Sequence, residues 1–118
     1  MNRLNISTST DEKTTITTIR LEGFLDADTV LRLRKILLDL IKEERYRLII
    51  DLEKLEYISS AGVGVFIGVI KRLRENSGDI IFLHPLPPVY RVLNILGLTK
   101  IFKILDRDEE AVAEFKKS

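Results

Sequence analysis

Two kinds of hydrophobic pattern follow one another along this chain, and the first indicates paired strands. Leu4–Thr8 and Thr15–Leu21 are rich in Ile and Thr, a composition typical of strands, and Thr10–Lys13 between them resembles a turn. We expect Glu22-Gly23 to end the second strand. From Val30 onward the apolar residues recur every three or four positions, with charged residues between them, which predicts an amphipathic helix.

The rest of the chain repeats this alternation of strand-like and helix-like segments. Short continuous apolar runs favour strands covered on both faces, and apolar spacing of three to four favours helices. The further strands are expected at 47–52, 79–83 and 101–105, and the further helices at 60–76, 87–96 and 108–117. This order predicts an α/β fold with a mostly parallel sheet, an N-terminal antiparallel strand and a cover of about four helices.

Local signals suggest where the helices begin and which faces they bury. Asp26 or Asp28 is expected to cap the first helix, and Asp106 or Asp108 the last one. In helix 60–76 the expected core stripe includes Ile67, and residues such as Val65 or Val69 are expected near the surface, as part of a docking patch. The full stripe is Val63, Phe66, Ile67, Ile70 and Leu73.

Length and composition narrow the class of protein. The 118 residues, 45% of them hydrophobic, fit a single domain over 1–118 with a core of its own. With 19 Lys and Arg against 18 Asp and Glu, we expect no broad nucleic-acid or anionic-membrane surface. The polar start and an apolar run, Ala61–Ile70, of about half a bilayer span lead us to expect a cytoplasmic protein without membrane insertion.

Candidate catalytic and metal chemistry is sparse. The chain has no cysteine and one histidine, His84, which excludes thiol chemistry and any site that needs two imidazoles. Ser60 does not stand in a Gly-x-Ser-x-Gly motif, and the spacing of Gly62, Gly64 and Gly68 matches no phosphate-binding loop. We therefore expect neither an enzyme nor a site for a metal or cofactor.

Two serines before a glycine-containing helix remain the most informative feature. Taken by itself, Ser59 or Ser60 is best interpreted as a helix N-cap. The three glycines at 62, 64 and 68 each lower helix stability by about 1 kcal/mol relative to alanine, and some contact should compensate. Close packing of the helix on the sheet and close approach of a partner are both open explanations.

Three segments in the same order resemble the STAS domain, the fold of bacterial anti-sigma factor antagonists. Asp51 and Ser59–Val65 are similar to the family's aspartate-ended strand and Asp-Ser-Ser/Thr-Gly-Leu-Gly-Val signature. Gly23–Thr29 resembles its Gly-x-Leu-Asp-x-x-Thr segment. Val89–Leu98, followed by Ile101 and Phe102, resembles the last helix and strand. The resemblance covers nearly the whole chain, and Ser59 stands where the family usually has an acidic residue.

The resemblance implies a partner switch rather than catalysis. It assigns the phosphorylated serine to Ser60, with Ser59 as second choice, and places Asp26 near the acceptor. The other expected partner-binding positions are Ala61, Gly62, Val63 and Gly64. The implied partners are an anti-sigma factor serine kinase, which binds the unmodified protein, and a serine phosphatase that resets it. The alternative is a STAS protein that is not phosphorylated, acting as a subunit of an ABC-type lipid-transport complex or as a scaffold or sensor module.

Overall fold

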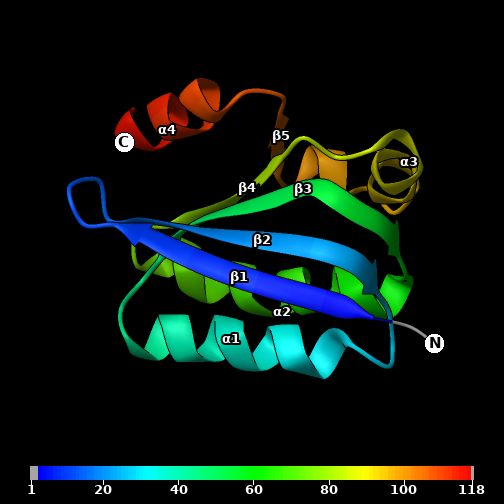
Figure 1. Cartoon of the computed structure of the whole chain (residues 1–118). Helices are drawn as coiled ribbons and strands as arrows, with labels where there is room; N and C mark the ends of the chain where they lie inside the picture. The colour runs from blue at the N-terminus through cyan, green and yellow to red at the C-terminus, as the bar shows by residue number, and fades with distance from the viewer. Residues whose placement is uncertain (1–2, 118) are drawn as a thin grey trace.

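A five-stranded sheet with helices on both faces forms the fold of this chain in a computed structural model that describes residues 3–117 (Figure 1). Residues 1, 2 and 118 of the expected domain lie outside the described residues. The strands are β1 (Leu4–Asp11), β2 (Ile16–Leu25), β3 (Arg47–Ile58), β4 (Asp79–Leu83) and β5 (Lys103–Leu105). The helices are α1 (Val30–Lys42), α2 (Ser60–Glu75), α3 (Pro87–Ile95) and α4 (Asp108–Lys116), with a 3-10 turn at Leu98–Lys100.

The predicted topology is confirmed. The strand order is β1-β2-β3-β4-β5, with β1 antiparallel to β2 and every other pair parallel. The larger hydrophobic core joins α1, α2 and α3 to one face of the sheet, and Phe66, Phe82 and Phe102 meet edge to face within it. A smaller core lies under α4 on the opposite face, where Ala111 and Phe115 contact the sheet.

Three strands are longer than the sequence predicted, because β1 continues to Asp11, into the segment expected as a turn, and β2 and β3 both extend at their carboxyl ends. Glu22-Gly23 does not end β2, because Gly23 adopts a φ of +108° and stays paired with β1 at Leu4. A Cβ at Gly23 would lie 2.4 Å from the Arg3 carbonyl oxygen, so only glycine fits this approach. β3 continues past residue 52 to Ile58, with two register shifts against β2. These shifts break the alternation by which a strand is recognised in sequence.

The predicted caps and one predicted helix face are wrong in detail. The N-cap position is Thr29 in α1 and Arg107 in α4, so no aspartate occupies either one, although Asp26 Oδ1 accepts the Thr29 amide just before α1. The last strand begins at Lys103 rather than at residue 101. Val65 and Val69 are buried in the larger core, to which α1 and α2 both contribute, whereas Ile67 is 47% exposed. The exposed face of α2 is therefore the one that carries Ile67, not the one that carries Val65 and Val69.

Candidate functional site

The candidate site lies where β2 and β3 both end and α1 and α2 begin. Leu25 pairs with Ile58 at the ends of these strands, and the Ser59 amide donates to the Leu25 carbonyl oxygen at 2.9 Å. The carboxyl ends of parallel strands are where α/β proteins usually place their functional groups. A shallow open depression forms there, lined by Phe24, Asp26, Ala27, Asp28, Tyr57, Ser59, Ser60 and Ala61.

The two serines play different structural roles. Ser59 is the N-cap of α2, and its Oγ accepts a hydrogen bond from the Gly62 amide at 3.2 Å. Ser60 is the first residue of the helix, and its side chain is exposed. The capping role that the sequence allowed for either serine thus belongs to Ser59. The Ser60 hydroxyl therefore lies at the helix N-terminus and is open to solvent.

Asp26 is buried and holds the turn before α1. Its Oδ1 accepts hydrogen bonds from the amides of Asp28 (2.9 Å) and Thr29 (3.2 Å), and the Thr29 hydroxyl lies 3.3 Å away. Only 8% of Asp26 is exposed, yet the residue lines the same depression as Ser60. The Asp26 side chain and the exposed serine consequently line the same depression, with Asp26 held by the turn that it stabilises.

The glycines of α2 separate into two kinds. A Cβ at Gly62 would lie 2.8 Å from Leu25 Cγ, so this glycine allows the helix to pack closely on the end of β2. Gly64 and Gly68 are exposed, and a Cβ at either position would meet nothing within 4 Å. Of these three glycines, packing among the described residues therefore explains Gly62 alone. The other two leave a smooth, open strip on α2 that a partner could approach closely.

The surface around Ser60 combines residues that the sequence predicts for it with others that the sequence does not mark. Ala61 and Gly64 are exposed as a contact role requires, whereas Gly62 and Val63 are buried and present no side chain to a partner. Ile67 continues the strip one turn beyond Gly64. Its exposure could not be read from a helical spacing that also fits the core stripe.

An aromatic pair forms the other rim of the depression. The rings of Phe24 and Tyr57 lie 6.1 Å apart, and Tyr57 is 48% exposed. Both belong to the parts of β2 and β3 that extend beyond the predicted strands. No separate signal in the sequence marked them, because the register shifts that bring them together arise from strand pairing.

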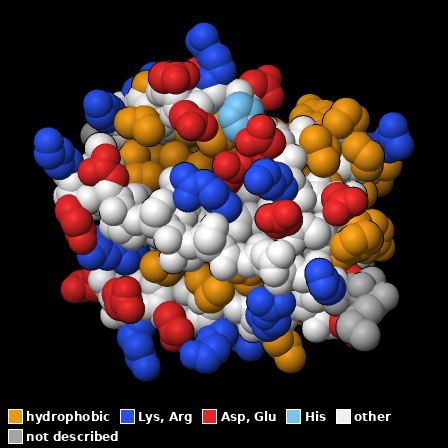
Figure 2. Space-filling view, in the orientation of Figure 1, with side chains coloured by type: hydrophobic (Ala, Val, Ile, Leu, Met, Phe, Trp, Pro, Cys, Tyr) orange, Lys and Arg blue, Asp and Glu red, His pale blue; other side chains and the backbone are white. Residues whose placement is uncertain are grey.

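The single histidine lies away from this site, and neither a metal-binding group nor a membrane-spanning helix is found among the described residues. His84 lies at the end of β4, with Nε2 3.5 Å from Asp108 Oδ1, and it does not line the depression. Within residues 3–117 no group of three His, Cys, Asp or Glu side chains could hold a metal ion. Over the same range no helix is long and apolar enough to span a bilayer. The face in Figure 2 mixes acidic and basic side chains, and its hydrophobic side chains gather most clearly over α3.

Comparisons with known proteins agree on one family. The family model described as STAS domain matches residues 7–111. The chain is 33% identical over 96 residues to BtrV of Bordetella bronchiseptica, covering 81% of this chain and 83% of BtrV. It is 27% identical over 114 residues to the anti-sigma F factor antagonist of Paenibacillus polymyxa, covering 96% and 97% of the two chains.

Solved structures of one relative are similar in fold as well as in sequence. The unphosphorylated form of the anti-sigma factor antagonist SpoIIAA, from Bacillus, superposes with a TM-score of 0.80 at 26% identity and covers 98% of each chain. Its phosphorylated form superposes with a TM-score of 0.69, covering 95% of this chain and 98% of that one.

Proposed function

Because this chain belongs to the STAS domain family, we propose that it is an anti-sigma factor antagonist switched by phosphorylation of Ser60. In its unmodified form it binds an anti-sigma factor serine kinase, which then releases its sigma factor. The kinase phosphorylates Ser60, the complex dissociates, and a serine phosphatase restores the starting state. The names of its relatives support the antagonist role, and SpoIIAA has been solved in unphosphorylated and phosphorylated forms.

The observation that carries the proposal is the division of roles between Ser59 and Ser60. A kinase needs a free hydroxyl that it can reach, and the Ser60 side chain is exposed. The Ser59 hydroxyl instead lies against the Gly62 amide as a cap, and the residue is only partly exposed. Modifying Ser59 would remove the cap of α2, whereas modifying Ser60 would leave it in place. This geometry favours Ser60 over the second choice, Ser59.

A phosphate on Ser60 should be compatible with the fold but should weaken binding to the partner. It adds a charge of about −1.5 to −2 at a helix N-terminus, where free amides and the helix dipole favour an anion. The fold should therefore tolerate the modification. In the complex the same group would have to be desolvated against the partner, beside the carboxylate of Asp26. The phosphate should therefore change the affinity for the partner more than the stability of the fold.

The partner surface that we propose is the exposed strip of α2 together with the rim of the depression. Ala61, Gly64, Ile67 and Gly68 form the strip, and Tyr57 is the exposed aromatic on the rim. Without side chains at 64 and 68 a partner's backbone could come close to the helix. The chain would act by binding alone, through these residues and Ser60, with no reaction of its own.

Phosphate transfer from a cognate kinase tests this proposal. Wild type, Ser60→Ala and Ser59→Asn would be incubated with ATP and anti-sigma factor kinases from the same source, then analysed by intact-mass and peptide mass spectrometry. Ser59→Asn removes the hydroxyl but keeps a preferred N-cap residue, so it is the matched control for a folded α2. We expect one phosphate on wild type and Ser59→Asn, and none on Ser60→Ala.

Two other outcomes would change the assignment. Loss of phosphate in Ser59→Asn alone would keep the switch and move the acceptor to Ser59. A kinase that binds the protein tightly and transfers no phosphate would overturn the switch. Stable co-purification with an ABC-type ATPase would then point to the transport role.

A further inference from the structure

One edge of the sheet is long, regular and unprotected. β1 forms this edge over eight residues, whereas β5 forms the opposite edge over only three. From Leu4 to Thr10 the strand has no charge and no proline, and its pairing with β2 has no register shift. Charged residues, proline, bulges and short length are the usual protections of an edge strand against pairing with another chain. The middle of β1 has none of these.

The hydrogen bonds at one end of β1 show which of its backbone groups face outward. The Phe24 amide donates to the Arg3 carbonyl oxygen, so Arg3 and every second residue after it exchange hydrogen bonds with β2. The groups of Leu4, Ile6, Thr8 and Thr10 consequently face away from the sheet. Among the described residues only Leu4 gains a partner there, because Arg32 Nη1 donates to its carbonyl oxygen at 2.5 Å.

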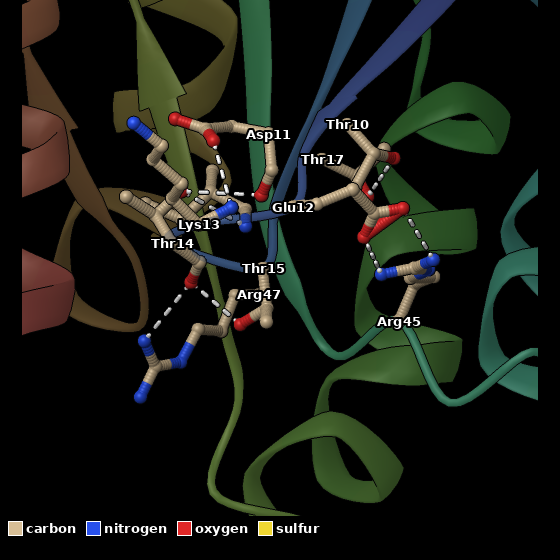
Figure 3. Close-up of polar contacts among 10 residues, drawn as sticks. Thr10, Asp11, Glu12, Lys13, Thr14, Thr15, Thr17, Arg45 and Arg47 are labelled. Carbon is tan, nitrogen blue, oxygen red and sulfur yellow. Dashed lines mark hydrogen bonds and ion pairs between the residues drawn. The ribbon is translucent and has the colours of Figure 1, made fainter.

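Two arginines mark the limits of the open stretch. Arg32 of α1 occupies the Leu4 end, and beyond the other end Arg45 forms a two-pronged ion pair with Glu12, at 2.9 and 3.1 Å (Figure 3). Between them α1 runs alongside β1 in the same direction (Figure 1). Ile36, one turn after Arg32 on the same face of α1, is partly exposed. Ile36 thus adds a partly exposed apolar side chain to this face of α1.

We propose that β1 is a self-association site, where a second copy of this chain pairs antiparallel about a two-fold axis at Thr8. In this register Thr8 pairs with Thr8 of the other copy, and Ile6 pairs with Thr10 in both directions. Each of these three pairs exchanges two hydrogen bonds between outward-facing groups. A register shifted toward the N-terminus would need the Leu4 carbonyl that Arg32 occupies.

The side chains of β1 suit pairing with an identical strand. In this register Ser7 lies opposite Ser9, and Asn5 lies opposite Asp11, whose carboxylate can accept from the amide. No like charges face each other between residues 4 and 11. An isologous contact of this kind closes into a dimer and does not propagate. It uses none of the residues around Ser60, so it is independent of the proposed switch.

Sedimentation equilibrium of the full chain over a range of concentrations tests the proposal, with Thr8→Pro as the disrupting variant. Proline removes the outward Thr8 amide, which makes no hydrogen bond within the described chain, and edge strands tolerate proline at such positions, so β1–β2 pairing should remain. Losing the two hydrogen bonds on the axis should raise the dimer dissociation constant roughly tenfold or more. Thr8→Val is the matched control, because it keeps the amide and a β-branched side chain; it should dimerise as wild type does.

Hydrogen exchange of the wild-type protein gives a second readout that depends on no variant. We expect the amides of Ile6, Thr8 and Thr10 to become protected as concentration rises, and those of Asn5, Ser7 and Ser9 to be protected throughout. A wild-type mass of 13.6 kDa at all concentrations, or dimers with unprotected Thr8, would overturn the proposal. Equal dimerisation of wild type and a folded Thr8→Pro would do the same.

Discussion

Gly62 lies against Leu25 so closely that a methyl group at Gly62 would be 2.8 Å from Leu25 Cγ and 2.9 Å from its carbonyl oxygen. The same carbonyl accepts the Ser59 amide, so this one contact joins the end of β2 to the start of α2. It sets how close the helix that carries Ser60 comes to the sheet. The position of the candidate acceptor thus depends on a residue without a side chain.

Gly62→Ala should destabilise the protein. Because the nearest atoms include backbone and a buried leucine, the new methyl group must push α2 away, at a cost of about 1–3 kcal/mol typical of overpacking. Urea denaturation of wild type and variant measures the free energy of unfolding. An unchanged midpoint would contradict the close contact.

Gly64→Ala and Gly68→Ala should have the opposite effect on stability. A Cβ at either position enters open space, so the better helix propensity of alanine should stabilise the protein by about 0.5–1 kcal/mol. If a partner approaches this strip, the same variants should bind the cognate kinase more weakly despite their greater stability. Denaturation and binding measured together separate the two effects, and unchanged binding would remove the strip from the proposed interface.

Ser59→Ala should cost more stability than Ser60→Ala. The Ser59 hydroxyl caps α2, and removing such a cap typically costs about 1 kcal/mol. The Ser60 side chain is exposed in the first turn, and its replacement should change the free energy of unfolding by less than about 0.5 kcal/mol. Thermal melts of both variants make the comparison. Equal losses would mean that the division of roles between the serines is wrong.

Substitutions at Asp26 should separate its structural role from its charge. Asp26→Ala leaves the Asp28 amide without its partner and should destabilise the protein by about 1–3 kcal/mol. Asp26→Asn keeps an acceptor oxygen and should lose less. If the charge opposes a phosphate on Ser60, the phosphorylated Asp26→Asn protein should bind the kinase more tightly than phosphorylated wild type. Titration calorimetry of the two phosphorylated proteins with the kinase tests this. Identical affinities would mean that Asp26 acts only by stabilising the turn before α1.

Glu114 should make the attachment of α4 sensitive to acid. The hydrogen bond from the Lys103 ammonium lowers the pKa of the Glu114 carboxyl, and Lys117 lies 3.4 Å from its other oxygen. A lowered pKa in the folded state gives stability that is present above the carboxyl's ordinary range and lost as the pH falls through the folded-state value. The melting-temperature difference between wild type and Glu114→Gln should therefore be largest near neutral pH and vanish in acid. Glu109→Gln, at an exposed position of the same helix, is the control and should show a smaller pH-dependent difference.

Much of the fold could be predicted from the sequence, because local patterns depend on neighbours along the chain. The helical spacing in 30–41 and the continuous apolar runs at 47–52 and 79–83 identified their elements. The serine pair and two of the three family-like segments, Gly23–Thr29 and Ser59–Val65, contain residues that line the site. These signals require no knowledge of which surfaces meet.

Tertiary structure decided what depends on contacts between distant segments. Packing of the larger core buries Val65 and Val69 and leaves Ile67 exposed, although helical spacing alone fits both arrangements. Register shifts against β2 carry β3 on to Ile58, and strand pairing places Tyr57 beside Phe24. Leu25 explains Gly62, whereas no contact within residues 3–117 explains Gly64 or Gly68. The sequence by itself therefore determined the elements, their order and the segment that holds the site. Which face of that segment meets solvent was decided by packing, because burial is a property of the assembled chain.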